Sequence, residues 1–304
     1  MSPHGFDLPA DEHDLLRGAP PASALHWVER SVGPGARLAD VRAMEGGTSS
    51  AIHAVTVEYR DRTISLVLRR FVRQDWLAEE PDLAAHEAEA LRLAAAARIP
   101  TPRLVAVDET GDQTDVPAIL MERLPGAIEW NPADLEGYLR RLAEPLPVLH
   151  AVPVPAQTII PPYAIYEPIP RRPPPDVPHP AVWERAIEIA HGPPPGNEGT
   201  FIHRDYHPGN VLWMDGAVTG IVDWASAAIG TPEADVGHCR LNLHGAFGPA
   251  AADRFLEIYQ EITGRREYHP YWDIASALGG REESDSIMEL RDTDDFLTRA
   301  VARL

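Results

Sequence analysis

One segment constrains the fold of this chain more than any other: residues 201–224, which read FIHRDYHPGNVLWMDGAVTGIVDW. Two short apolar runs, 211–213 and 218–222, lie on either side of Asp215 and Gly216. An Asp-Gly pair between apolar runs is typical of two antiparallel strands joined by a tight turn. The segment therefore predicts a β-hairpin that is entered by a polar loop.

Polar side chains stand at the open end of this hairpin. Asn210 enters the first strand and Asp223 leaves the second, so the folded hairpin places them side by side. Together with Asp205, five residues before Asn210, they offer hard oxygen ligands that suit Mg²⁺ and its bound phosphates. The carboxylate of Asp205 could then accept a proton from an attacking hydroxyl. Asp and Asn at this spacing also cap turns, but the ordered set with His203 favours a catalytic site.

The segment also carries a family resemblance. HRDYHPGN at 203–210, followed by IVDW at 221–224, resembles the catalytic and metal-binding loops of the aminoglycoside phosphotransferase and choline kinase-like family, relatives of the protein kinases. This resemblance implies a two-lobed protein-kinase-like fold with a nucleotide, ATP or GTP, between the lobes. It implies that Asp205 is the catalytic base or orients the hydroxyl, and that Asn210 and Asp223 hold Mg²⁺.

Further details favour the antibiotic-kinase branch of this family. Tyr206-His207-Pro208 and Trp224 resemble that branch more than the protein kinases, and no Ala-Pro-Glu segment follows. The resemblance therefore implies a small-molecule acceptor with a hydroxyl group, and it disfavours a protein substrate.

Two neighbouring residues are interpreted as structural. Asp235, twelve residues after Asp223, resembles the acid that braces the catalytic loop in the family. His203 is interpreted in the same way, as a histidine that packs the loop in preference to a proton shuttle.

The rest of the chain fits an α+β fold. Alternating apolar residues predict a small, antiparallel, five-stranded amino-terminal lobe over residues 1–120, with helices over 20–32 and 82–98. A hinge at 121–126 leads to a larger, mostly helical lobe over 127–304. The strands are expected near 36–44, 51–59, 63–71, 103–108 and 117–123. The later helices are expected near 132–150, 181–191, 233–244, 249–263, 270–279 and 285–303.

Residues 153–195 are unusually rich in proline. A structureless loop of that length is uncommon in a compact domain. The segment is therefore either a functional cover on the substrate side or an ordered, polyproline-like wrap around a short helix. Upstream, Pro145 and Pro147 are expected to kink the helix over 132–150 near its end.

The resemblance also assigns residues that cover the nucleotide. A glycine-rich loop between the first two strands resembles the loop over the phosphates, where glycines let the backbone approach and hydroxyls and amides donate. An ordinary Gly-Gly hairpin turn is the alternative. Met121, Glu122 and Leu124 lie in a segment that resembles the hinge whose backbone reads adenine. The loop residues are Gly46, Gly47, Thr48, Ser49 and Ser50.

The chain contains no lysine, so all 27 basic residues are arginine. This absence excludes Schiff-base chemistry and an intact Walker A loop. The family usually has a lysine on the third strand, and strand alternation here puts Val67 and Arg69 on one face. By resemblance Val67 would cover the adenine, while Arg69 would reach the phosphates and pair with Glu87. Arginine preserves the charge of a lysine but changes the geometry of its contacts.

The composition limits the binding partners and the location expected for this protein. The formal net charge of −19 argues against binding to nucleic acid or to an anionic membrane. A single cysteine, Cys239, forms no internal disulfide, and residues 1–16 lack the pattern of a signal peptide, so a cytoplasmic location is expected. The acidic segment 281–295 could attract a cationic aminoglycoside, although a solvated helical face is the simpler interpretation.

These observations predict a Mg²⁺-dependent kinase that moves the γ-phosphate of ATP or GTP to a hydroxyl of a small molecule. The acceptor could be an aminoglycoside, a macrolide, a choline-like alcohol, a sugar or a homoserine-type metabolite, and antibiotic resistance is one possible outcome. The alternative is a nucleotide-binding pseudokinase that senses or scaffolds. Arg69 motivates that alternative, and the intact set of Asp205, Asn210 and Asp223 argues against it.

Overall fold

The computed structural model describes residues 10–45, 50–166, 168–196, 198–280 and 287–304. The chain divides into two compact units: the first holds residues 1–96 and 101–124, and the second holds residues 97–100 and 125–304. The described part of the chain has no helix that is long and apolar enough to cross a membrane. A hinge at 121–126 stays a prediction.

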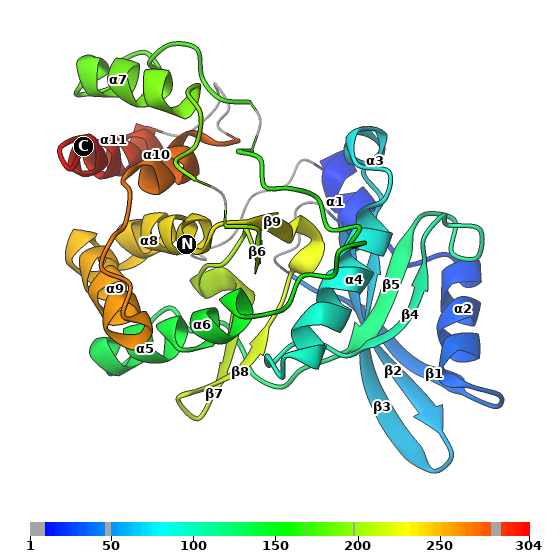
Figure 1. The fold of residues 1–304 in the computed structure, drawn as a ribbon. Coiled ribbons are helices and arrows are strands. Elements are labelled where there is room, and N and C mark those ends of the chain that lie inside the picture. The colour runs from blue at the N-terminus through cyan, green and yellow to red at the C-terminus, as the bar shows by residue number, and fades with distance from the viewer. Residues whose placement is uncertain (1–9, 46–49, 167, 197, 281–286) are drawn as a thin grey trace. The chain divides into compact units, whose positions relative to one another are not determined.

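A five-stranded antiparallel sheet forms the centre of the first unit, in the order β1-β2-β3-β5-β4 (Figure 1). Each predicted strand is present to within one or two residues, because alternating apolar residues suit a sheet that is covered on its faces. Arg60 and Asp61 close the β2–β3 turn with positive φ angles of 49° and 61°. The strands are β1 (Arg37–Ala43), β2 (Ala51–Tyr59), β3 (Arg62–Arg70), β4 (Leu104–Asp108) and β5 (Ala118–Glu122).

The two faces of this sheet are covered by different helices. Trp27 of α2 (Ala22–Val32) packs with Leu66 and Leu68 of β3 in a buried apolar cluster. Arg69, the next residue of β3, points the other way and contacts α4 (Leu83–Ala96). The predicted alternation of β3 is therefore confirmed. Two short helices, α1 (Ala10–Arg17) and α3 (Gln74–Glu79), were not predicted.

Helices are the main regular elements of the second unit, and α8 lies at their centre, in contact with α9, α10 and α11. The helix predicted over 132–150 is broken at Glu144, where Pro145 becomes the first residue of a new helix. Proline lacks the N–H that a continuous helix needs but fits a helix start. The helices are α5 (Leu135–Ala143), α6 (Pro145–His150), α7 (Pro180–Ala190), α8 (Pro232–Phe247), α9 (Pro249–Thr263), α10 (Tyr271–Leu278) and α11 (Ile287–Val301).

Two small antiparallel sheets lie on either side of the loop over residues 203–210 in the sequence. The predicted hairpin is present as β7 (Val211–Met214) and β8 (Ala217–Ile221), and both turn residues, Asp215 and Gly216, have positive φ. The other sheet pairs β6 (Thr200–Ile202) with β9 (Ala228–Gly230). These three-residue strands were not predicted, because they are too short to show a periodicity.

A short stretch of the proline-rich segment, residues 161–163, lies along β9. Pro162 forms a parallel bridge with Ile229 of β9. The amide of Tyr163 donates to the carbonyl of Ile229, and the amide of Ile229 donates to the carbonyl of Pro161, each at 2.8 Å. The segment also contains α7. A role in covering the substrate stays a prediction.

Candidate functional site

In the first unit, Arg69 and Glu87 form a buried ion pair. Nη1 of Arg69 lies 3.0 Å from Oε1 of Glu87, and the two side chains are only 2% and 0% exposed. Nε of Arg69 donates to Oγ of Ser50 at 2.8 Å. The predicted contact between Arg69 and Glu87 is therefore present, and Ser50 joins it. The other four residues of the predicted phosphate loop, 46–49, lie outside the described residues.

Val67, Met121 and Glu122, which are predicted to lie at the adenine, belong to the same sheet, and Leu124 follows two residues after β5. Val67 pairs in register with Met121 of β5. The amide of Glu122 donates to the carbonyl of Arg103 at 2.9 Å, so that amide is used within the first unit. Among the described residues, the amide of Leu124 has no backbone hydrogen bond.

In the second unit, the loop over residues 203–210 brings Asp205 and Asn210 together. Nδ2 of Asn210 donates to the carbonyl oxygen of Asp205 and to its Oδ2, both at 2.9 Å. The amide of Val222 donates to the carbonyl of Asn210 at 2.9 Å. Asp223 follows directly in a left-handed conformation, with φ 66°. The three residues therefore lie at the open end of the hairpin, as the sequence predicts.

Asp235 of α8 holds the first residues of this loop through hydrogen bonds to their backbone. Its buried carboxylate accepts the amides of His203 at 3.0 Å and Arg204 at 2.6 Å. It also lies 3.0 Å from Nε2 of His150. His203 is fully buried, with Nε2 3.0 Å from the carbonyl oxygen of Val222. These contacts agree with structural roles for Asp235 and His203.

His238 is the site residue that the sequence analysis missed. It lies on α8, and its Nε2 is 2.9 Å from Oδ1 of Asp205. His207, on the loop itself, has its Nε2 4.0 Å from the same oxygen. Residues three apart share a helix face, so the place of His238 after Asp235 was the one available signal. The resemblance already placed Asp235 against the loop, so this spacing could have pointed to His238.

Hydrogen bonds control the charge of this cluster. Burial by itself would raise the pKa of Asp205, but the hydrogen bond from His238 and nearby imidazole charge outweigh it and hold that pKa well below its usual range. Burial lowers the pKa of His207 to about 4. The hydrogen bond from His238 is the largest of the contributions that hold the pKa of Asp205 down, and it is therefore the main support of the ionised carboxylate.

Asp205, His207 and His238 lie close enough together to raise the question of a metal site, with one ligand atom each within 4.8 Å of the others. A histidine that binds a metal ion usually donates its other ring N–H to an acceptor. Here Nδ1 of His207 instead accepts from the amide of Gly209 at 3.1 Å, so the proton of the neutral ring lies on Nε2. His207 therefore lacks the arrangement of a transition-metal ligand, and the contact that joins Asp205 to this group is the one with His238 at 2.9 Å.

Hard oxygen ligands fit Asn210 and Asp223 better. Because Nδ2 of Asn210 is used by Asp205, its amide oxygen is the atom that can bind a cation. The carboxylate of Asp223 follows at the same end of the hairpin. An amide oxygen and a carboxylate are ligands that suit Mg²⁺.

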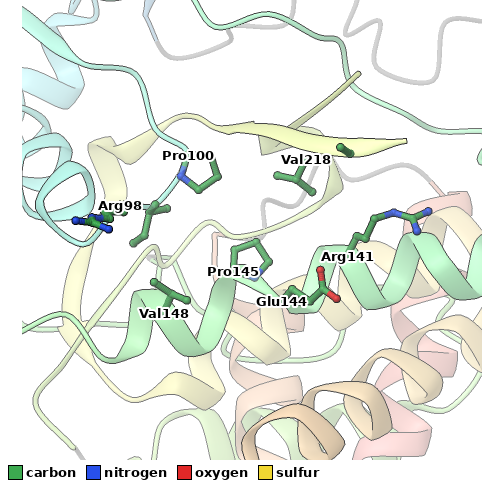
Figure 2. A pocket seen from close by; sticks show the side chains of 9 residues that line it. Arg98, Pro100, Arg141, Glu144, Pro145, Val148 and Val218 are labelled. Carbon is green, nitrogen blue, oxygen red and sulfur yellow. The ribbon is translucent and has the colours of Figure 1, made fainter. Parts of the chain in front are cut away.

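A hollow of about 360 Å³ in the second unit is separate from these residues (Figure 2). Its walls are mainly apolar, with Pro100, Pro145 and Val218 among the side chains that point into it, and Arg98 and Glu144 at its edges. None of the described site residues lines it. The hollow is therefore not the candidate active site.

A sequence model of the phosphotransferase enzyme family (APH) matches residues 40–271, which is most of the chain. The chain belongs to this family. This phosphotransferase has the α+β, protein-kinase-like fold of small-molecule kinases, with a five-stranded antiparallel sheet in one unit and mainly helices in the other. None of the curated proteins matches it.

Solved structures with the same fold include three antibiotic kinases. Macrolide 2′-phosphotransferase MphH from Brachybacterium faecium is 21% identical, with a TM-score of 0.56 over 83% of this chain and 86% of that chain. Aminoglycoside-3′-phosphotransferase of type VIII is 19% identical, with a TM-score of 0.53 over 91% and 97%. A thermostable mutant of aminoglycoside phosphotransferase APH(4)-Ia, in a ternary complex with ADP and hygromycin B, is 14% identical, with a TM-score of 0.55 over 93% and 97%.

Proposed function

We propose that this phosphotransferase moves the γ-phosphate of ATP or GTP to a hydroxyl group of a small molecule, with Mg²⁺ as its metal. The observation that carries the proposal is the carboxylate of Asp205, held by Asn210 at the end of the hairpin that also carries Asp223. Phosphoryl transfer needs mainly positioning and charge neutralisation. This arrangement supports both.

Asp205 orients the acceptor hydroxyl in this proposal. Each of its carboxylate oxygens has one hydrogen-bond donor, and each keeps a further lone pair for the substrate. The low pKa makes Asp205 a weak base. It therefore acts by holding the hydroxyl in line, with little removal of the proton before transfer.

Mg²⁺, when bound, neutralises negative charge on the phosphates. Asn210, through its amide oxygen, and Asp223, through its carboxylate, are the residues that would hold it. The tight contact of Asn210 with Asp205 keeps the metal-binding residue and the orienting residue at a fixed spacing.

Arg69 is the proposed phosphate-binding cation on the nucleotide side. Its pairing with Glu87 and its contact with Ser50 hold the guanidinium on the face of β3 that also carries Val67. The backbone of Met121, Glu122 and Leu124 is proposed to contact the base. Structures of APH(4)-Ia mutants with ADP or with AMP-PNP support the use of an adenine nucleotide.

Neighbouring structures suggest where to look for the acceptor. Hygromycin B is bound in three structures of APH(4)-Ia mutants, and another neighbour is a macrolide 2′-phosphotransferase. We therefore place antibiotics of these two classes first among the acceptors, followed by choline-like alcohols, sugars and homoserine-type metabolites.

An acceptor screen tests this proposal. The purified protein is incubated with Mg²⁺, ATP or GTP and each acceptor, and mass spectrometry detects the gain of one phosphoryl group. Asp205→Asn should lower the rate by at least about 100-fold, within the range for loss of a positioned acid–base group, while nucleotide binding is kept. If wild-type protein binds nucleotide but phosphorylates nothing, the pseudokinase alternative replaces the proposal.

A further inference from the structure

His238 reaches Asp205 from a different element than the loop on which Asp205 lies. Its Nε2, from α8, is 2.9 Å from Oδ1, while Nδ2 of Asn210 is 2.9 Å from Oδ2. Two donors on two elements therefore hold the two oxygens of one carboxylate. Rotation of that carboxylate about its Cβ–Cγ bond would break both hydrogen bonds.

The proton in the contact between His238 and Asp205 belongs to the histidine. An ionised carboxylate can only accept hydrogen bonds, so Nε2 of His238 is the donor. This atom then has no free lone pair. His238 therefore cannot take a proton passed on by Asp205, and it cannot bind a metal ion through Nε2 while the contact lasts. What remains is a role in holding the carboxylate.

The catalytic loop is fastened to α8 at a second point, which does not depend on His238. One helical turn earlier, Asp235 accepts the amides of His203 and Arg204, immediately before Asp205. This buried brace fixes the backbone of the loop. Loss of His238 should therefore release the side chain of Asp205 while the loop stays folded.

We propose that His238 is a positioning residue for phosphoryl transfer, which holds the carboxylate of Asp205 in the orientation that receives the acceptor hydroxyl. The side chains of Asp205 and His238 are 28% and 18% exposed, so an acceptor can reach the free lone pairs of the carboxylate. The inference rests on the proposed function, because His238 would act only through Asp205 and its orientation of the acceptor hydroxyl.

Three substitutions of His238 test whether its hydrogen bond matters or only the packing of its ring. His238→Gln places an amide nitrogen near the position of Nε2 and keeps the hydrogen bond. His238→Asn has the same amide on a shorter side chain and cannot reach, and His238→Leu has no donor. His191→Leu, the same change at an exposed histidine beyond α7, is the matched control.

Steady-state kinetics with ATP, Mg²⁺ and the acceptor found in the screen give the first measurement. We expect His238→Leu and His238→Asn to lower kcat about tenfold or more, which corresponds to the loss of one charge-assisted hydrogen bond. The kcat of His238→Gln should stay within about threefold of the wild-type value, which is small beside the tenfold loss expected when the hydrogen bond is removed. The KM for ATP should be unchanged in all of them, because the contact of His238 with Asp205 lies within the second unit and the residues proposed to contact the base belong to the first.

Several results would overturn the inference. Equal kcat values for the Gln, Asn and Leu variants would show that the donor does not matter. A large rise in the KM for ATP with unchanged kcat would point to nucleotide binding. If Asp205→Asn is inactive and His238→Leu is fully active, only the inference fails, whereas an active Asp205→Asn variant removes the proposed function and the inference together.

Nitrogen NMR of ¹⁵N-histidine-labelled protein tests the contact without any turnover. The chemical shift of Nε2 in His238 should be that of a protonated nitrogen, and it should change in Asp205→Asn. An unprotonated Nε2 in the wild-type protein would overturn the donor assignment on which the inference depends.

Discussion

Arg69 makes two side-chain contacts that the lysine usual at this position in the family could not make in the same way. Its guanidinium uses separate nitrogens for its two contacts, Nη1 for Glu87 and Nε for Ser50. A lysine offers all its donors from one atom and does not match this fork. Arginine at this position therefore joins helix α4 and Ser50, the last residue of the predicted phosphate loop, to strand β3.

Breaking this buried pair should destabilise the protein strongly. Arg69→Leu leaves the carboxylate of Glu87 buried without its counter-charge, and we expect the free energy of unfolding to fall by about 3–5 kcal/mol. Arg42→Leu is the control, because Arg42 pairs with Asp40 at the surface, where such pairs contribute at most about 1 kcal/mol. Urea-induced unfolding of both variants measures the difference. Equal losses would contradict the argument from burial.

His53 should make stability depend on pH. It is buried on β2, with Nε2 3.0 Å from the carbonyl oxygen of Gly18, and burial lowers its pKa. The unfolded chain then binds protons more readily than the folded one, so stability is full above the unfolded pKa of about 6.5 and falls as the pH drops below it.

The measurement is the melting temperature between pH 7.5 and 5.5. His53→Gln keeps a donor for Gly18 but cannot take up a proton, so its melting temperature should fall less over this range than that of the wild type. His244, whose pKa burial also lowers, leaves some pH dependence in the variant. Identical slopes for the two proteins would rule out His53 as a source of acid sensitivity.

At the level of elements, local sequence patterns predicted the strands and the hairpin, because these form through interactions between residues close in the sequence. The strands of the first sheet and the β7–β8 hairpin follow from alternation and from Asp215-Gly216, and the approach of Asn210 to Asp205 follows from that hairpin. The contact of His238 with Asp205 depends on how α8 packs against the loop, and no local pattern encodes it. Short elements such as α3 and β6 were missed because they have too few residues to show a period.

The catalytic loop and the hairpin turn make different demands on their glycines. A Cβ at Gly209 would lie 2.6 Å from Cε1 of His207, so Gly209→Ala should displace that ring and lower kcat about tenfold or more. Gly216 has open space around it but a φ of 75°, so Gly216→Ala should cost about 1 kcal/mol of stability and leave kcat unchanged. Kinetics and thermal unfolding of both variants test the distinction. A normal kcat for Gly209→Ala would show that the position of the His207 ring is unimportant.

Over the whole molecule, acidic side chains outnumber basic ones by 46 to 27. Self-repulsion of this kind opposes the compact state and is screened by salt, with a Debye length of about 10 Å at 0.1 M. The melting temperature should therefore rise as NaCl is added to a low-salt buffer. A gain of about 1 kcal/mol corresponds to roughly 2–4 °C in a domain of 150–250 residues.

A charge variant separates repulsion from other effects of salt. Glu58, Glu109 and Asp112 are exposed, and none forms an ion pair within the described residues. Changing all three to the corresponding amides should raise the melting temperature at low salt and have little effect at 0.5 M NaCl, where the charges are already screened. If the variant gains equally at both salt concentrations, the gain comes from local contacts. In that case the net charge of −19 does not measurably lower the stability of the fold, because solvent separates the charged side chains from one another.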